Sequence, residues 1–582
     1  MKTDNLKYVG LLVIMVVIAL ITTYHYPETC KIQEGDCYFL FTMDYFRVRL
    51  ADIPALNSYI TDFLYQFYRW PLAAGFIVSL LYGITSFVFL RAFKRIDLGA
   101  SVLATGVALI LPFLVVVLAP FILCLQLDAF FFSLALMAYV SCRDFRKRII
   151  VCALIAPYCV LFINPAISII LFLFLSAIER FCLHGRAWVP LAGILLFLCA
   201  IYLYSQYVTF VSFERRILYV RGLFRDSFAP YILSYFLFVL IFIPFGKTIK
   251  MLRLAVCLIV CVLAGLIYRM MTNKESVATE LFYTYASLAE HHKWDELLRT
   301  IRAHGGATNR VALRYALMAE TGLGTLPENL FSYNIKTPDD FLFLHDREKL
   351  ACFFNRQFYA NISIYDEAMH HAMEYGLQTD NGTCFSTLRY MTECQIREGD
   401  YPVALKYLTI LDKSLFNKEF VKMQRKRIAE YQKEGRGPIS AIRADNFVGA
   451  YPFNSEMIRF AQTRTNNKVY IDYVLCGLLL QRNMHHFCTI IRGLNPYGDQ
   501  EVPRAFAEAA AMGKAMGQNL HDCVNYSVKY DEGFLAFQKE YEGDNFNPGP
   551  YTGTYWRYFF CDEIWEAEQR AAAEKKSGNA PK

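Results

Sequence analysis

The sequence PETCKIQEGDCYFLFTMDYFRVRL, residues 27–50, opens a long polar stretch in an otherwise hydrophobic N-terminal half. The stretch continues to residue 70 and carries Glu34, Asp36 and Asp44 between two hydrophobic segments. A carboxylate at the edge of a bilayer costs several kcal/mol unless it is solvated or paired, so its presence there indicates a function. We therefore interpret residues 27–70 as a loop on a membrane surface, with these three acids as its candidate functional groups.

The composition separates the chain into two regions. Of the 582 residues, 55% are hydrophobic and 16% are aromatic, which is not the composition of a single soluble core. Apolar runs of spanning length dominate up to residue 270, whereas charged residues and helical periodicity dominate after it. We expect a membrane domain over residues 1–270, a soluble helical domain over 271–565 and a flexible tail over 566–582.

The apolar runs predict a bundle of about nine membrane helices. A span needs roughly 20 apolar residues to cross ~30 Å of hydrocarbon. The first run has no small-residue cleavage site after it, so we interpret it as a membrane helix and not as a signal peptide. Asn164-Pro165 separates two short runs, because proline lacks the backbone donor that would continue a helix. The predicted spans are residues 8–26, 71–90, 99–119, 121–142, 149–163, 166–183, 187–205, 229–246 and 251–269.

Basic clusters between the apolar runs predict the orientation. The net charge of +7 comes partly from clusters that flank spans, such as residues 91–95 and 143–148, which indicates topology and not a nucleic-acid partner. With nine spans, the N-terminus is cytoplasmic, and the loops 27–70 and 206–230 share the outer face with everything after residue 270. This predicts a multi-pass protein of a bacterial inner membrane with a periplasmic C-terminal domain. Losing one of the two short helices would reverse the side of the C-terminal domain.

The second outer loop contains arginines beside the membrane. Arg215, Arg216 and Arg221 lie in a region where the positive-inside tendency disfavours them. A guanidinium can hold phosphate through two parallel hydrogen bonds, so these residues are candidates for binding a phosphate-bearing lipid. The alternative is that they extend to the interface and pair with Glu214.

After residue 270 the pattern predicts antiparallel helical hairpins over residues 275–565. Residues 398–408 resemble the turn and second helix of a tetratricopeptide repeat, since Gly399 ends one helix and the small Ala404 lets two helices cross closely. A weaker echo lies at residues 467–491, but the family's period of 34 residues is not kept. Such a domain would present a curved surface to a peptide or protein partner.

Histidine and cysteine patterns do not predict a metal centre. The pairs at residues 291–292, 370–371 and 485–486 are adjacent in sequence, whereas two zinc ligands on one helix are usually four residues apart. The 17 cysteines form no framework, although Cys30 and Cys37 could form a disulfide on an oxidising face. Motifs of soluble enzymes, such as a phosphate-binding loop or a nucleophile elbow, are missing from the sequence.

A first membrane helix that leads into an outer loop with Glu34, Gly35, Asp36 and an aromatic residue, followed by many spans and a soluble domain, resembles the GT-C superfamily of membrane glycosyltransferases. The resemblance implies a lipid-phosphate-linked sugar as donor substrate. It implies Asp36 or Glu34 as the catalytic carboxylate and Asp44 as a second acid, which in some members binds a divalent cation. Arginines would hold the donor phosphate, here Arg215, Arg216, Arg221 and Arg47.

Two other classes compete with a transferase. A membrane-anchored scaffold for an envelope protein complex would use the helical domain to recruit partners and needs no catalysis. Transport is a further alternative, for which Asp128 within a predicted span is the main candidate residue. A cavity lined jointly by the loop acids and by Arg215 and Arg216 would favour the transferase, and dispersed acids would favour the scaffold.

Overall fold

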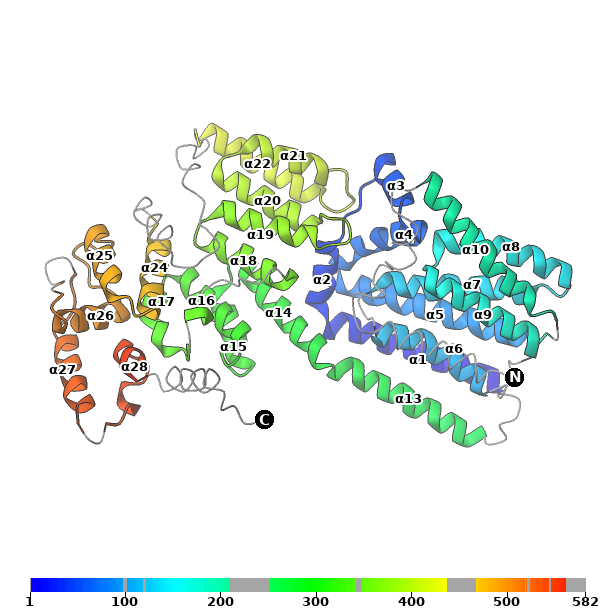
Figure 1. Ribbon diagram of the computed structural model, residues 1–582, viewed down its shortest axis with the longest axis horizontal. Helices are drawn as coiled ribbons and strands as arrows, with labels where there is room; N and C mark the ends of the chain where they lie inside the picture. Colours follow the sequence, from blue (N-terminus) through cyan, green and yellow to red (C-terminus); the bar gives the residue numbers. More distant parts are fainter. Residues whose placement is uncertain are drawn as a thin grey trace, which may run out of the picture. The chain divides into compact units, whose positions relative to one another are not determined.

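The computed structural model describes most of the chain, and the described part is helical (Figure 1). Within it, the β structure consists of one isolated parallel bridge between Glu501 and Asn525. The predicted all-α fold is therefore confirmed for the described residues. These are residues 2–97, 102–118, 122–183, 185–208, 252–335, 338–341, 348–436, 467–518, 520, 524–543 and 546–561.

The chain divides into two compact units. The membrane unit comprises residues 1–280 together with two later segments, 379–386 and 409–423. The helical unit comprises residues 281–378, 387–408 and 424–582. The two later segments follow the membrane unit by about a hundred residues in sequence, and hydrophobic patterning alone does not assign them to it.

The long helices of the membrane unit pack as neighbours, with α1 against α5, α5 against α6 and α7, α6 against α13, and α8 against α10 (Figure 1). Their bounds are α1 (Lys2–His25), α5 (Pro71–Arg95), α6 (Val102–Leu118), α7 (Leu123–Ser141), α8 (Phe145–Phe162), α9 (Pro165–Phe181), α10 (Trp188–Tyr207) and α13 (Leu252–Thr272).

Four of these helices are long and apolar enough to cross a membrane: Lys7–His25, Pro71–Arg95, Leu123–Ser141 and Trp188–Tyr207. A shorter apolar helix covers Ala104–Val117. The structure places helices at eight of the nine predicted span positions, and the predicted span at 229–246 lies outside the described residues. The helices of spanning length indicate a multi-pass membrane protein.

Helix α1 has two apolar faces. Leu11, Ile14 and Ile18 are buried against the bundle, whereas Leu12 and Val16 are about half exposed or more. An apolar stripe that faces away from the protein is unfavourable in water and favourable against lipid. The exposed stripe therefore supports a lipid-facing position for α1.

The break between α8 and α9 follows from its sequence. Pro165 is the first residue of α9, where its missing N–H costs nothing. The Asn164 side chain accepts a hydrogen bond from the Ala166 N–H at 3.1 Å and so caps the new helix. The predicted interruption at Asn164-Pro165 is confirmed.

Close contact between α1 and α5 depends on Gly75. A Cβ atom at this position would lie 2.7 Å from the Ala19 carbonyl oxygen, which belongs to the backbone of α1. We expect Gly75→Val to lower the free energy of unfolding by about 1–3 kcal/mol, because the two backbones would have to separate. Detergent-induced unfolding followed by circular dichroism would measure this. Gly10→Val is the matched control, since nothing lies within 4 Å of a Cβ there; equal losses for both variants would contradict the explanation.

The loop after α1 is folded into short helices, which we call the cap. They are α2 (Pro27–Asp36), α3 (Met43–Leu50), α4 (Ala55–Tyr65) and η1 (Gln66–Arg69). The N-terminus of α2 is held by Glu280, whose carboxylate accepts hydrogen bonds from the backbone N–H groups of Glu28 and Thr29, both at 2.8 Å. A carboxylate at a helix N-terminus satisfies otherwise unpaired donors and offsets the helix dipole.

The helices after the bundle form successive pairs, of which α18/α19, α15/α16, α24/α25 and α26/α27 are in direct contact. The bounds are α14 (Lys274–Glu290), α15 (Trp294–Ala303), α16 (Arg310–Leu323), α17 (Leu326–Asn329), η3 (Leu330–Ser332), η4 (Pro338–Asp340), α18 (Lys349–Asn361), α19 (Tyr365–Leu377), α20 (Phe385–Glu398), α21 (Tyr401–Leu411), α22 (Lys418–Lys433), α24 (Lys468–Leu480), α25 (Met484–Leu494), α26 (Arg504–Ala515), α27 (Lys529–Tyr541), η6 (Gly549–Tyr551) and α28 (Tyr555–Phe560).

Four turns between these helices share one geometry. Each contains a residue in the left-handed region two positions before the next helix: His292, Ser363, Gly399 and Arg482. The N–H of the following residue then bonds back to a carbonyl five residues earlier, as from Asp400 to Gln395 at 2.9 Å. This is the hydrogen bond of a Schellman-type helix end, which glycine adopts without steric cost. Gly399 ends its helix as the sequence predicts.

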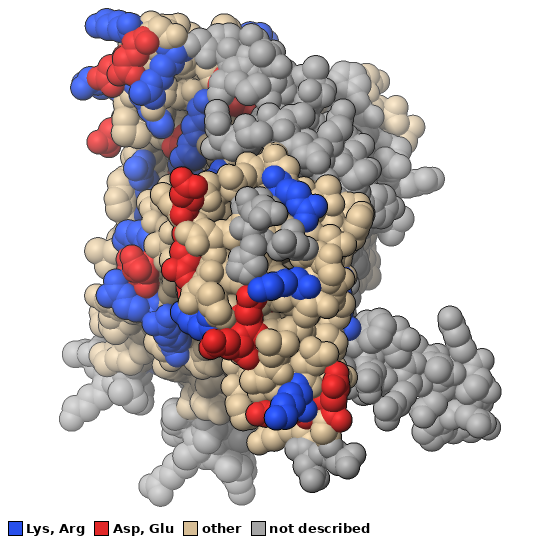
Figure 2. Space-filling model, turned by 90° about the vertical axis from the view of Figure 1, so that its left-hand side faces the viewer, with Lys and Arg blue, Asp and Glu red and all other residues tan. Residues whose placement is uncertain are grey.

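Charged side chains of both signs are scattered over the described part of the surface that Figure 2 shows. Lys and Arg are interspersed with Asp and Glu on this face, and do not gather in one basic area.

Candidate functional site

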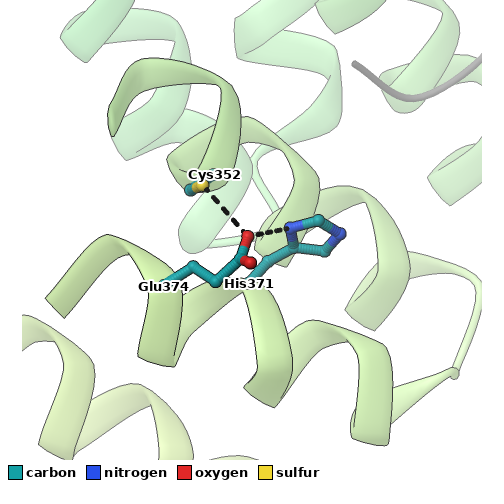
Figure 3. Close-up of side chains that lie close together, drawn as sticks. All are labelled: Cys352, His371 and Glu374. Atoms are coloured by element: carbon teal, nitrogen blue, oxygen red, sulfur yellow. Dashed lines mark hydrogen bonds and ion pairs between the residues drawn. The ribbon is translucent and has the colours of Figure 1, made fainter. Parts of the chain in front are cut away.

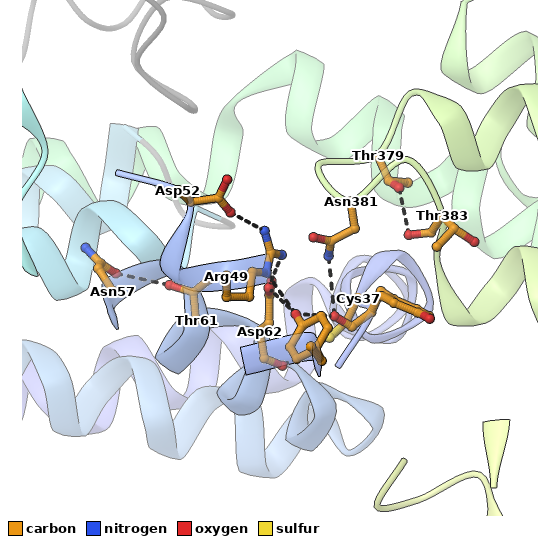
Figure 4. A network of polar contacts seen from close by, with 11 residues as sticks. Cys37, Arg49, Asp52, Asn57, Thr61, Asp62, Thr379, Asn381 and Thr383 are labelled. Atoms are coloured by element: carbon orange, nitrogen blue, oxygen red, sulfur yellow. Dashed lines mark hydrogen bonds and ion pairs between the residues drawn. The ribbon is translucent and has the colours of Figure 1, made fainter. Parts of the chain in front are cut away.

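The cap is built around the guanidinium group of Arg49, which is 3% exposed (Figure 4). Thr42 caps α3 by accepting a hydrogen bond from the Tyr45 N–H, and the i, i+4 spacing places Tyr45 and Arg49 on one face of that helix. Arg49 forms ion pairs with Asp62 of α4 and, at 2.6 Å, with Asp52. The buried positive charge therefore ties α3 to α4.

The Tyr45 hydroxyl completes this network. It accepts a hydrogen bond from Arg49 Nε at 2.9 Å, and its single proton can go to Asp62 at 2.7 Å or to the Tyr38 carbonyl oxygen at 2.6 Å. Burial and the charge of Asp62 raise the pKa of Tyr45, so the phenol stays protonated. Burial alone would lower the pKa of Arg49, but Asp62, Tyr45 and Asp52 together raise it. The network is thus a positive centre held by acids, with a neutral phenol.

Cys37 and Glu34 lie beside the same network. The Cys37 thiol donates to the Asp62 carbonyl oxygen at 3.0 Å. Burial, followed by the negative charges of Asp62 and Glu34, raises the pKa of this thiol well above its usual value. Glu34 itself is 5% exposed, at the end of α2. Cys37 is therefore protonated at neutral pH and is not poised as a nucleophile.

The segments 379–386 and 409–423 form hydrogen bonds with the cap. The backbone N–H of Phe385 donates to the Cys37 carbonyl at 2.9 Å, and the N–H of Phe41 donates to the Lys413 carbonyl at 3.1 Å. Asn381 Nδ2 lies 3.4 Å from the Tyr38 carbonyl oxygen (Figure 4). Backbone hydrogen bonds of this kind hold two chain segments in one register.

A side chain of the segment 409–423 also packs against the end of the cap. Phe416 packs edge-on against Trp70 and Phe67, with ring centroids 4.9 Å and 5.3 Å apart, and its carbonyl accepts a hydrogen bond from Arg69 at 2.9 Å. The aromatic side chains of Phe67 and Trp70, at the end of the cap, thus contact protein.

The predicted catalytic acids differ in their surroundings. Glu34 is buried, and Asp36 is half-buried at the end of α2. Asp44 is exposed at the start of α3, where it pairs with the exposed Arg47 at 3.7 Å. Arg215, Arg216 and Arg221 lie outside the described residues.

The suggested Cys30–Cys37 disulfide is wrong. Both thiols are free and buried, and the Cys30 Sγ lies 3.9 Å from the Thr22 carbonyl oxygen. Cys30 lies near the start of α2, and Cys37 follows directly after its last residue. Seven helical residues advance the chain by roughly 10 Å, which exceeds the usual Cα separation in a disulfide.

Asp128 is a buried carboxylate in α7. It is 2% exposed, and its Oδ1 accepts hydrogen bonds from Asn57 Nδ2 at 2.8 Å and from the Asn164 N–H at 3.0 Å. The acid thereby connects α4 of the cap, α7 and the start of α9. The sequence marks Asp128 but neither of its partners, since Asn57 and Asn164 lie 71 and 36 residues away.

Residues that could hold a metal ion lie in the helical unit. Cys352, His371 and Glu374 bring three potential ligand atoms within 4.8 Å of one another. Burial and the neighbouring His370 lower the pKa of His371 to about 4 and outweigh Glu374, so this imidazole is neutral at neutral pH. The sequence does not mark this cluster as a metal site, although the i, i+3 spacing of His371 and Glu374 on α19 is a visible signal.

Comparison with known proteins identifies the family of the chain. Residues 4–562 match the profile of a family of unknown function, DUF6057. No curated protein and no solved structure matches the chain.

Proposed function

We propose that this chain, which belongs to the DUF6057 family, is a membrane-anchored scaffold. Its helical hairpins bind a protein partner. The membrane helices anchor the chain, and the cap holds segments of the later helices. In this proposal the cap and the helical hairpins lie on the outer side of a bacterial inner membrane, with about nine spans. The hairpins act like tetratricopeptide repeats, which present a surface to a peptide or protein.

The observation that carries this proposal is the hydrogen bonding between the cap and the segments 379–386 and 409–423. Both segments flank α20 and α21, so the chain returns to the cap on either side of that hairpin. Chain attached to an anchor at several points loses less freedom when a partner binds than chain attached by a flexible tether. This arrangement suits presentation of a binding surface and requires no catalysis.

Helix α19 offers a specific contact point for a partner. Met373 and Leu377 lie one turn apart on its outer face and are 55% and 60% exposed. Exposed apolar side chains at i, i+4 spacing form the kind of ridge that fits a groove on another protein. We therefore place the partner contact on this face of α19.

The test is quantitative copurification of the full chain from native membranes after chemical cross-linking. We expect a protein partner to be recovered with the wild-type chain and lost at least tenfold with the double variant Met373→Asp/Leu377→Asp. Val311→Asp/Leu323→Asp is the control, since it places the same two charges on other exposed apolar residues of the helical unit. Equal recovery of every protein with the α19 variant and with the control would refute the scaffold.

A carboxylate-dependent glycosyltransferase is the second candidate, supported by the burial of Glu34 beside membrane helices. A desolvated carboxylate is suited to take a proton from an acceptor. The triple variant Glu34→Gln/Asp36→Asn/Asp44→Asn separates the two candidates. If the scaffold proposal is correct, this variant retains its partner and the cells do not accumulate lipid-linked sugar. Accumulation of the lipid-linked donor with partner binding intact would favour the transferase.

A further inference from the structure

Three side chains of different chemistry meet between α18 and α19 (Figure 3). Cys352 comes from the first turn of α18, and His371 and Glu374 come from the middle of α19. The two helices form one of the tightly packed hairpins of the helical unit. Since His371 and Glu374 are three residues apart, they lie on the same face of α19, and that face is turned toward Cys352.

Two of the three separations between the ligand atoms match those around a single small cation, and all three lie within 4.8 Å. The Cys352 Sγ lies 3.6 Å from Glu374 Oε2, and Glu374 Oε2 lies 3.8 Å from His371 Nδ1. Two ligands of one tetrahedral zinc ion, at bond lengths of about 2.0–2.3 Å, are roughly 3.3–3.8 Å apart. One ion could therefore reach all three atoms with small side-chain adjustments.

The cluster is not explained as an ordinary ion pair. His371 Nδ1 is buried and has no hydrogen-bond partner, because 3.8 Å from the carboxylate is too long for one. A buried nitrogen without a partner is unfavourable. The ring is also held in place by stacking on Tyr359, at a centroid distance of 5.4 Å and an angle of 8°. The structure thus fixes an imidazole whose Nδ1 is aimed at Glu374 without a hydrogen bond.

Neighbouring groups hold the other two side chains in position. Gln378 Nε2 donates to the Cys352 sulfur at 3.7 Å and to the Glu374 carbonyl oxygen at 3.4 Å. His370 Nε2 lies 3.4 Å from Glu374 Oε1, the carboxylate oxygen that does not face Cys352. Metal ligands in proteins are commonly oriented by such outer hydrogen bonds.

We propose that Cys352, His371 and Glu374 bind one zinc ion in the α18/α19 hairpin. A thiolate, an imidazole and a carboxylate together suit Zn²⁺, whereas Mg²⁺ and Ca²⁺ take oxygen ligands only. Three protein ligands leave a fourth position for water or for a side chain of a partner. The proposal is independent of the scaffold function, because the site could stabilise the hairpin whether or not a partner binds.

Cobalt substitution of the full chain in detergent tests the site. The chain is stripped of metal with a chelator under reducing conditions and titrated with Co²⁺. We expect the sulfur-to-cobalt charge-transfer band and the visible bands of a tetrahedral ion, at one equivalent, and their loss when Zn²⁺ is added. No such bands, or bands unaffected by Zn²⁺, would overturn the proposal.

Matched variants assign the bands to these residues. Cys352→Ala should abolish the charge-transfer band, and Cys394→Ala, which removes another buried thiol of the same unit, should leave it unchanged. Gln378 is a positioning residue, because its amide donates to the Cys352 sulfur. Gln378→Leu should therefore weaken Zn²⁺ binding about 10- to 100-fold. If Cys352→Ala does not fold, Glu374→Gln tests the site in its place. This substitution keeps the shape of the side chain and should weaken Zn²⁺ binding. Wild-type metal affinity in both Glu374→Gln and a folded Cys352→Ala would exclude the site.

Discussion

Arg49→Met is expected to lower the free energy of unfolding of the cap by about 3–5 kcal/mol. The substitution removes the guanidinium that Asp62 and Tyr45 face, and leaves the buried Asp62 carboxylate without the positive charge of its ion pair. A buried charge without its counter-ion is among the most costly defects in a folded protein. Hydrogen exchange of the α3 and α4 amides should accelerate by roughly a hundred- to several-thousand-fold, since each 1.36 kcal/mol is about a factor of ten.

Two further variants show whether the loss comes from the unpaired charge. The double variant Arg49→Met/Asp62→Leu should recover much of the lost stability, because both members of the pair become apolar. Arg47→Met is the matched control, as its side chain and that of its partner Asp44 are 73% and 92% exposed. It should leave exchange unchanged, since exposed ion pairs contribute little. Exchange as slow in Arg49→Met as in Arg47→Met would show that the cap does not depend on the pair.

Arg148→Met is expected to destabilise the membrane unit by a similar amount, about 3–5 kcal/mol. Arg148 of α8 pairs with Glu179 of α9 at 3.0 Å, and Glu179 also accepts a hydrogen bond from Tyr139 of α7 at 3.0 Å. The same guanidinium donates to the carbonyls of Cys142 and Arg143, just after the end of α7. One side chain therefore joins three helices, and its loss would leave the buried Glu179 without the guanidinium that it faces.

The measurement is unfolding of the purified chain in mixed micelles of increasing denaturing detergent. Arg148→Met should unfold at a clearly lower detergent fraction than the wild-type chain, and Arg148→Met/Glu179→Met should unfold between the two. Lys147→Met provides the control, because Lys147 is exposed and pairs with Asp144 at the surface. Its effect should stay within about 0.5 kcal/mol. Identical unfolding of the Arg148 and Lys147 variants would rule out the three-helix connection.

Local sequence predicted the helices well. Apolar runs of spanning length correspond to helices at the described positions, and the break at Asn164-Pro165 and the turn at Gly399 lie where the residues require them. Each of these features depends on residues within a few positions of one another. Periodicity, proline and left-handed glycine act through the nearby backbone, so their effects can be read without knowing what packs against them.

The candidate sites were less predictable, because their members are distant in sequence. The sequence marked Glu34, Asp36 and Asp44 as unusual, but the buried pair of the cap joins Arg49 to Asp62, 13 residues later. Asn381 reaches Tyr38 over 343 residues, and Cys352 meets His371 and Glu374 from another helix. Many acids and amides along the chain could have been chosen equally well as partners.

The sequence by itself thus determined that this protein is helical, that it has apolar helices of membrane-spanning length, and that a polar loop follows the first of them. Only the tertiary structure decided that this loop is a folded cap, that Arg49 and Asp62 are its buried centre, and that the segments 379–386 and 409–423 belong to it. The physical reason is that helix formation is governed by short-range propensity and hydrophobic pattern, whereas the partner of a buried charge is set by which helices pack together.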